Sequence, residues 1–189
     1  HGRHLHELAH GRDDREVTPN QGVKSVSHEE TFAVDLFDQR RLLDEAVRMA
    51  DAVGNRLRAA GRRGRTVNIK VRFGDFQTIT RAFTLASPTD SGTVIAREAK
   101  RLLEQIDPTP GVRLLGVGVS GIAKETAGEQ LTFDDLTSND LEWREAEGAI
   151  DEIRDKFGEA AIGPASSLRS GGLKPKRSGD QPWGPGDQP

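Results

Sequence analysis

The clearest pattern along the chain is a strict alternation of apolar and polar residues over 66–73 (TVNIKVRF). Side chains of a strand point alternately to its two faces, so this segment predicts a half-buried strand whose outer face is polar and basic. Gly74-Asp75 predicts a tight turn, and a second strand is expected over 76–85. Arg81 falls on the apolar side of that second strand, which indicates either a bulge or an edge position.

Three segments instead repeat their apolar residues at helical spacing. The first runs from about 38 to 60, with Asp38 as its N-cap and apolar positions at Leu43, Ala46, Val47, Ala50, Val53 and Leu57. The second begins at 88–91 and ends before Pro108. The third covers 140–157, with an apolar stripe at Trp143, Ala146, Ile150, Ile153 and Phe157. That stripe predicts packing, either on the rest of the chain or on a partner.

Two further strands complete the predicted domain. Residues 24–32 suggest a strand of poor alternation, and 112–119 are apolar enough for a central strand in which Gly116 and Gly118 mark a close approach of backbone or partner. The resulting order is β-α-β-β-α-β, an α+β fold with two helices on one face of a four-stranded sheet. The other face, which reads as polar and basic, is left for solvent or a partner. Gly61 and Gly64 are expected to bracket the turn before the second strand.

The two ends of the chain differ from this central part. A short helix around Leu5, Leu8 and Ala9, closed by Gly11, is followed by a linker over 14–23. Residues 123–139 form an acidic linker, 140–163 hold the last helix, and 164–189 are rich in Ser, Gly, Pro and Lys and are expected to be disordered. The predicted folded domain is therefore 24–122.

Composition narrows the function classes. The chain has no Cys, which excludes disulfides and thiolate metal sites, and no apolar run approaches the ~20 residues of a membrane span. No signal peptide is visible. It begins His1-Gly2-Arg3 and its one Met is Met49, so we expect a piece of a longer protein. The net charge of −3 hides a basic stretch over 62–81, with six basic residues against one acid, which suits an anion-binding surface.

Several segments in the same order resemble the C-terminal region of DinB-type polymerases, the polymerase IV-like members of the Y family. These are the opening strand 24–32, the hairpin segments 66–72 and 76–81, the final strand 113–121, and residues 8–13, which are similar to the end of the family's thumb domain. The resemblance covers about residues 1–163. The segment 157–166 resembles a helix-and-tail motif of many DinB proteins, and 179–185 resembles the terminus of actinobacterial members.

The resemblance implies a little finger domain that grips duplex DNA in an error-prone translesion polymerase of DNA repair. The family's catalytic carboxylates, which bind magnesium, lie in an N-terminal palm with no counterpart here, so we expect no catalytic residue, no cofactor and no metal in this chain. The parent is expected to be a magnesium-dependent, DNA-directed DNA polymerase. A cytoplasmic, nucleoid-associated location, a monomeric state and no membrane partner are also expected.

The candidate DNA contacts are basic and hydroxyl side chains on or near the predicted sheet. Such groups bind phosphates, release counterions and carry no sequence information, as a polymerase sliding along any template requires. They are Lys24, Ser25, Ser27, Arg63, Arg65, Lys70, Arg72, Thr78, Thr80 and Arg81. Without the family resemblance, the alternative is that these charges only make the sheet face soluble. Arg81 is also compatible with pairing to an acid at the edge of the core.

A second candidate site lies in the acidic linker. Its residues are Gln130, Leu131, Thr132 and Phe133, which resemble the Gln-Leu-x-Leu-Phe peptide by which bacterial polymerases dock on the sliding clamp. The segment departs from that pattern, because Phe133 occupies the Leu position and Asp134 the Phe position. It is otherwise a linker with two incidental apolar residues. A protein-interaction module is therefore the alternative to the DNA-gripping function.

Other functions fit the sequence less well. His6 and His10 have the i, i+4 spacing of two helical metal ligands, but no third ligand accompanies them. A stand-alone enzyme needs converging reactive groups, and no Ser/His/Asp or paired-carboxylate arrangement is visible. RNA binding by a similar sheet stacks bases on strand aromatics, whereas Phe73 and Phe83 share the side of the aliphatic core residues.

Overall fold

The computed structural model describes residues 2–16, 22–124, 140–158 and 161–168. In chain order its elements are α1 (Gly2–Ala9), β1 (Ser25–Leu36), α2 (Gln39–Ala59), β2 (Arg62–Phe73), β3 (Thr78–Thr89), α3 (Gly92–Leu103), β4 (Val112–Lys124), α5 (Asp140–Phe157) and the short 3-10 turn η1 (Ala165–Leu168).

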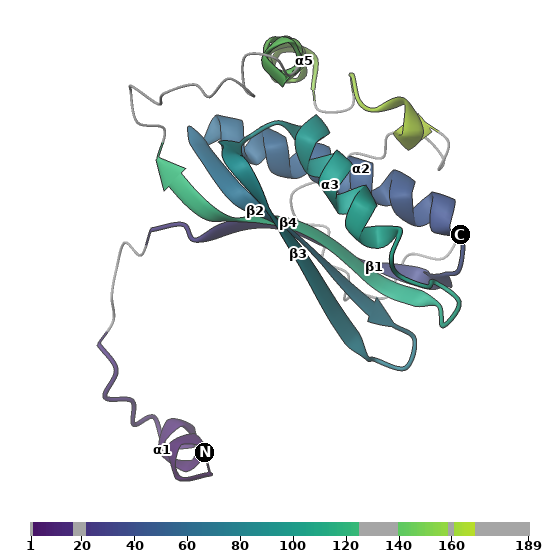
Figure 1. Ribbon diagram of the computed structural model, residues 1–189. Helices are drawn as coiled ribbons and strands as arrows, with labels where there is room; N and C mark the ends of the chain where they lie inside the picture. Colours follow the sequence, from purple (N-terminus) through teal and green to yellow (C-terminus); the bar gives the residue numbers. More distant parts are fainter. Residues whose placement is uncertain (1, 17–21, 125–139, 159–160, 169–189) are drawn as a thin grey trace, which may run out of the picture.

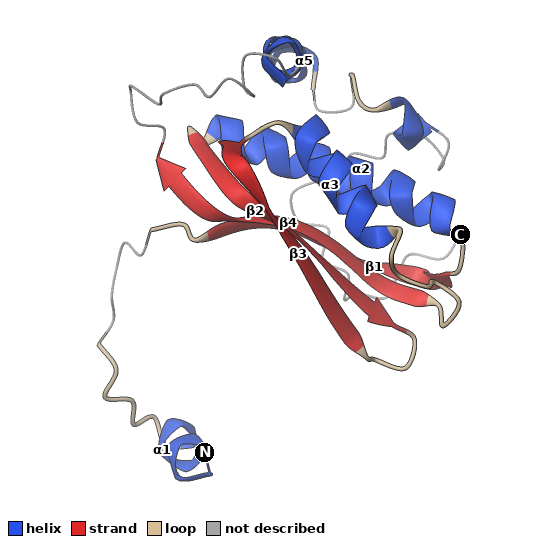
Figure 2. Ribbon diagram, viewed as in Figure 1, coloured by secondary structure: helices blue, strands red, loops and turns tan. Residues whose placement is uncertain are grey.

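The central part is a two-layer α+β structure. The four strands form one antiparallel sheet in the order β1-β4-β2-β3, and α2 and α3 lie side by side across one face of it (Figures 1 and 2). The predicted fold class and element order are confirmed. We call the uncovered side of the sheet the open face. Among the described elements, β1 and β3 are the edge strands, so the edge position was the correct alternative for Arg81.

All four strands run further than the alternation predicted. β2 begins at Arg62, β3 ends at Thr89 and β4 ends at Lys124. Gly64, expected in a turn, lies inside β2, where an added Cβ would clash with Val119 Cγ1. The ladder continues there because main-chain pairing does not need apolar side chains, and a glycine admits the neighbouring strand's residues.

The core lies between the sheet and the helical layer. Alternate residues of the central strands are buried, such as Val67, Ile69 and Val117, and they pack against the inner side of α2 and α3. In α2 the buried positions include Leu42 and Met49, which the predicted stripe omitted. Leu43 and Val47 of that stripe are only half-buried, so the buried side of α2 is rotated slightly from the prediction. Asp38 is the N-cap, as expected.

The ends of the chain follow the sequence only in part. α1 is present, and Gly11 after it has the positive φ of 71° expected of a helix-ending glycine. In the segment from 164 onward, which was expected to be disordered, residues Ala165–Leu168 form η1, and 169–189 lie outside the described residues. None of the helices in the described ranges is long and apolar enough to cross a membrane.

Candidate nucleic-acid interface

The open face is lined by rows of side chains that the strand register places next to one another. Each row crosses β1, β4, β2 and β3 in turn. The four rows are Ser25, Ser120, Thr66 and Thr84; Ser27, Gly118, Asn68 and Ala82; Glu29, Gly116, Lys70 and Thr80; and Thr31, Leu114, Arg72 and Thr78. The face is therefore built mostly from small and hydroxyl-bearing side chains, with its charges confined to the last two rows.

Two glycines of β4 make room for neighbouring side chains in the middle of the open face. A Cβ at Gly116 would lie 2.7 Å from Glu29 Cγ, and one at Gly118 would lie 2.8 Å from Asn68 Oδ1 and 3.1 Å from Ser27 Cβ. Side chains of β1 and β2 thus lean over the glycines from both sides. Of the two interpretations of these glycines, close packing within the sheet is the one observed, and a partner would meet Glu29, Ser27 and Asn68 there before the main chain.

The charged groups of the open face are partly paired with one another. Lys70 Nζ lies 2.9 Å from Glu29 Oε2, across Gly116, and the two side chains are 34% and 40% exposed. Arg72 donates from Nε to Thr78 Oγ1 at 2.9 Å. Exposed ion pairs of this kind contribute only about 0–1 kcal/mol to stability. Both cations therefore remain available for an anionic ligand.

The structure brings together six of the predicted DNA-contact residues. They are Ser25, Ser27, Lys70, Arg72, Thr78 and Thr80, all in the rows of the open face. Lys24 is exposed immediately before β1.

The remaining three predicted residues lie elsewhere. Arg65 donates from Nη2 to the Ala86 carbonyl at 2.7 Å, and Arg63 is half-buried. Arg81 is exposed but pairs in register with buried Ile69, so it belongs to the side of the sheet that the helices cover. These three do not extend the open face.

Sequence reasoning missed the acid of this site. Glu29 shares the parity of Ser25 and Ser27, so the alternation of β1 contained the signal. It also missed Asn68, and the pair of Thr66 and Thr84, whose hydroxyl oxygens lie 3.1 Å apart. Which acid lies beside which base depends on the strand register, and the chain order alone does not give it.

The sequence singled out two other groups of residues. Gln130, Leu131, Thr132 and Phe133 lie outside the described residues. The rings of His6 and His10 lie 4.3 Å apart in α1, and His10 Nδ1 is 2.9 Å from the His6 carbonyl. Within the described ranges no three or more His, Asp and Glu side chains are grouped so as to hold a metal ion.

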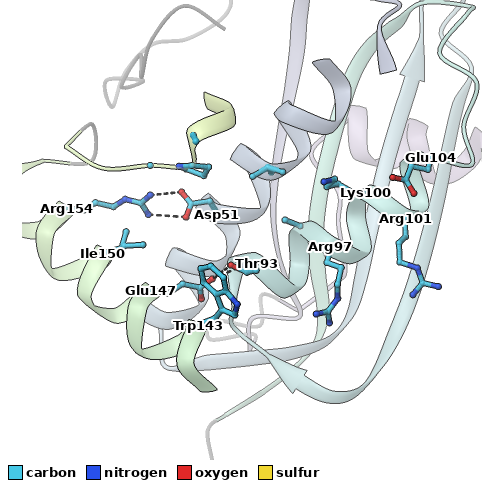
Figure 3. Close-up of a pocket in the computed structure, with 16 residues that line it drawn as sticks. Asp51, Thr93, Arg97, Lys100, Arg101, Glu104, Trp143, Glu147, Ile150 and Arg154 are labelled. Atoms are coloured by element: carbon cyan, nitrogen blue, oxygen red, sulfur yellow. Dashed lines mark hydrogen bonds and ion pairs between the residues drawn. The ribbon is translucent and has the colours of Figure 1, made fainter. Parts of the chain in front are cut away.

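The last helix docks on the helical layer through polar groups. Glu147 of α5 is buried at 7% exposure and accepts a hydrogen bond from Ser91 Oγ at 3.0 Å. It also accepts one from the Thr93 main-chain N–H at 2.9 Å, and Figure 3 shows Thr93 beside it. Ser91 is the N-cap of α3, so this carboxylate lies at the positive end of that helix. Of the predicted stripe, Ile153 and Phe157 are exposed and so do not pack on the described part of the chain, whereas Glu147, which the stripe omits, is buried.

Two arginines complete this docking. Arg58 of α2 lies 2.9 Å from Glu147 and 2.5 Å from Asp151, and Arg154 of α5 lies 2.7 Å from Asp51 of α2. Burial disfavours the charged form of Arg58, but its hydrogen bond to Asp151 and the charge of Glu147 outweigh burial and raise its pKa. Burial likewise acts to raise the pKa of Asp151, and hydrogen bonds from Arg58 and Asn55 lower it overall.

A groove of about 700 Å³ lies between α2, α3, α5 and the chain before η1. Trp143 and Ile150 of α5 line it together with Pro164, and Lys100 and Arg101 of α3 lie along its other side (Figure 3). The groove is on the helical side of the sheet. It is therefore a separate feature from the open face.

Comparison with known proteins gives consistent matches. The model of the impB/mucB/samB family C-terminal domain matches residues 23–133. DNA polymerase IV of Streptomyces coelicolor is 50% identical over 126 residues, which are 67% of this chain and 26% of that protein. DNA polymerase IV of Desulfatibacillum aliphaticivorans is 36% identical over 167 residues, 87% of this chain and 42% of that protein.

One solved structure supports the fold. A Y-family DNA polymerase chimera matches with a TM-score of 0.50 at 17% identity, covering 65% of this chain and 35% of that one. At that identity the match shows a shared architecture alone. The chain spans less than half the length of the two curated relatives, 26% and 42%.

Proposed function

Since the chain belongs to the Y family of DNA polymerases, as its impB/mucB/samB C-terminal or little finger domain, we propose that it is the duplex-DNA grip of a translesion polymerase. In this proposal the open face lies against the sugar–phosphate backbone of the primer–template duplex. It holds the duplex without reading its sequence, and synthesis takes place elsewhere in the whole protein.

The composition of the open face is the observation that carries the proposal. A surface of hydroxyls, one amide, and two cations against the one carboxylate of Glu29 offers hydrogen-bond donors and a small excess of positive charge to phosphates. Leu114, the one large apolar side chain of its rows, is half-buried and makes a poor anchor for a protein partner. These rows contain few side chains long enough to reach base edges, so we expect contacts mainly to the DNA sugar–phosphate backbone. Such contacts suit a domain that must accept any template.

Equilibrium binding of a fluorescent primer–template duplex across a salt series tests the proposal. The affinity is expected to fall steeply with salt and to be indifferent to sequence, because counterion release drives the binding. The double variant Lys70→Ala/Arg72→Ala is expected to bind roughly tenfold more weakly at low salt. Its slope of log affinity against log salt should be shallower by up to about two, one for each phosphate that is no longer neutralised.

A matched control carries the same charge change on the helical layer. Arg40 and Arg41 of α2 are both exposed, so Arg40→Ala/Arg41→Ala is expected to leave affinity and slope unchanged. Failure of the wild-type chain to bind at low salt would refute the proposal. Equal weakening by both double variants would show that net charge, and not the open face, determines binding.

We propose in addition that residues 130–133 recruit the polymerase to the sliding clamp. The support is the Gln-Leu-x-Phe sequence, which can supply a polar contact and apolar anchors to a pocket. Leu131→Ala/Phe133→Ala is expected to abolish retention of the chain on an immobilised bacterial clamp and to leave duplex affinity intact. Retention equal to wild type would assign the segment to the role of a plain linker.

For the whole protein we propose a DNA-directed DNA polymerase activity, since the curated relatives are DNA polymerases IV. In this proposal, its magnesium-binding carboxylates belong to a part of the protein outside these 189 residues. The part described above would supply binding and positioning alone. Primer extension assays of the 189-residue chain with magnesium test this division, and any templated extension would contradict it.

A further inference from the structure

At the tip of the β2–β3 hairpin, an aromatic residue adopts an unfavourable backbone conformation. Phe76 has a φ of 67°, and among the described residues no other residue except glycines has a positive φ. Its side chain is nonetheless 66% exposed. A bulky residue is disfavoured in the left-handed region, and strain of this kind gathers at binding sites.

The Phe76 ring is held in place by a fixed cation. The Arg113 guanidinium carbon lies 5.0 Å from the ring centroid. Arg113 is itself anchored by two hydrogen bonds to Asp35, at 3.0 and 3.2 Å. The ring therefore has a defined orientation although most of it faces solvent.

Close contacts between three segments build this end of the sheet. The Gly74 N–H donates to the Gly111 carbonyl at 2.9 Å, and a Cβ at Gly74 would lie 2.6 Å from Asp35 Oδ2. A Cβ at Gly111 would lie 2.9 Å from the ring of Phe37, which is 62% exposed. We name this group, consisting of Asp35, Phe37, Phe76 and Arg113, the tip cluster.

The tip cluster adjoins the charged end of the open face. The Thr78 hydroxyl hydrogen bonds to the Phe76 carbonyl at 3.5 Å and accepts from Arg72 Nε at 2.9 Å. A ligand lying along the last row of the open face thus reaches Phe76 next. Arg72 donates to Thr78 and Arg113 lies over the Phe76 ring, so each of these two positions has a cation beside it.

We propose that the tip cluster binds an unpaired nucleobase of single-stranded DNA adjoining the duplex, with the base stacked on Phe76. This inference rests on the proposed DNA-gripping function. Bases inside a duplex already cover one another, so an exposed ring gains stacking only from an unpaired base. Every base has such a face, which keeps the contact independent of sequence.

The charges beside the rings favour nucleic acid over a protein ligand. Arg113 covers part of the Phe76 ring. Arg72 is linked to Phe76 through the Thr78 hydroxyl, which also joins the tip cluster to the last row of the open face. The centre of a protein-docking site is expected to be depleted of charged residues. The tip cluster instead combines aromatic rings with cations, as single-strand binding surfaces do.

The test compares duplexes with a single-stranded overhang whose nucleotides either carry bases or are abasic. Both ligands have the same phosphates, so the ratio of their affinities isolates the bases. The full chain is expected to prefer the overhang with bases by roughly five- to a hundredfold, and Phe76→Leu is expected to abolish this preference. Phe76→Gly should also abolish it while keeping the fold, because glycine adopts a positive φ without strain.

The matched control is Phe83→Leu, an exposed phenylalanine of β3 with Arg101 5.6 Å from its ring centroid, away from the tip cluster. This variant should keep the preference, and circular dichroism should show all variants folded. Tight duplex binding by wild type with no preference for the overhang bases would overturn the inference and leave the DNA grip standing. Loss of duplex binding would overturn both.

A protein ligand at the tip cluster would give a different result. Phe76→Leu would then weaken retention on the sliding clamp and leave the affinities for the base-carrying and the abasic overhang unchanged. In that case the surface would be a protein-docking site, and the nucleobase assignment would be wrong. Photocrosslinking from 5-iodouracil in the overhang adds a positional readout. The expected crosslink maps to Phe76, and a crosslink confined to α2 or α5 would contradict the assignment.

Discussion

Lys70 shows how one neighbouring residue sets the charge of the open face. Its ammonium lies beside Glu29, so the basic strand that the sequence predicts is locally half-neutralised. In the absence of DNA the pair is exposed and weak, and its main effect is on the potential that an approaching phosphate meets. In the proposed function, Glu29 is thus expected to oppose DNA binding.

Glu29→Gln is therefore expected to strengthen duplex binding. Removing one negative charge near a bound phosphate contributes about 1 kcal/mol in water, or roughly a fivefold gain in affinity at low salt. The gain should shrink as salt screens the charge. Fluorescence anisotropy with a primer–template duplex measures it. Glu104→Gln, the same change at an exposed residue after α3, should have no effect, and an unchanged affinity for both variants would remove Glu29 from the interface.

At the level of elements, periodicity located each strand and helix but not their partners. The alternation in β2 identified the face of Lys70 and Arg72, and Asp38 marked the start of α2 correctly. The strand ends were missed because main-chain ladders continue through polar and glycine residues. The docking side of α5 was missed because it depends on buried polar partners, such as Ser91, which lies 56 residues from Glu147.

Glu147 is expected to hold α5 against the helical layer. Glu147→Gln keeps the side-chain volume but removes the carboxylate that pairs with Arg58 and accepts from the start of α3. We expect the free energy of unfolding to fall by about 2–4 kcal/mol and the α5 amides to exchange faster with solvent. Chemical denaturation and hydrogen exchange measure the two effects. Glu145→Gln, an exposed change in the same helix, should stay within about 0.5 kcal/mol of wild type.

Acid should also release α5. The pKa of Asp151 is lowered from its ordinary value of 3.8 in the folded chain, so its contribution to docking is fully present well above pH 3.8. That contribution decreases as the pH falls below 3.8 through the lower folded-state pKa. The indole N–H signal of Trp143, followed by NMR from about pH 6 to roughly pH 2, reports the release. Asp151→Asn should remove this acid dependence, and an unaltered titration would exclude Asp151 as its source.

On the scale of the whole molecule, the two layers separate the proposed tasks. The helical layer covers one face of the sheet and carries α5 on its outer side, away from the open face (Figure 1). The open face is thereby left uncovered, as the proposed contact with DNA requires. Releasing α5 is expected to leave duplex affinity unchanged, so Glu147→Gln should bind a primer–template duplex as wild type does. A parallel loss of affinity would mean that the layers are coupled.

The most direct test of the account is an NMR measurement of distances in the complex with a primer–template duplex. The open face carries methyl groups at Thr78, Thr80 and Ala82, whereas the outer side of the helical layer carries those of Ile150 and Ile153. We predict intermolecular nuclear Overhauser effects from DNA sugar protons to the open-face methyl groups and none to the helical side. Contacts from DNA to α5, with none to β3, would contradict the assignment of the open face as the DNA grip.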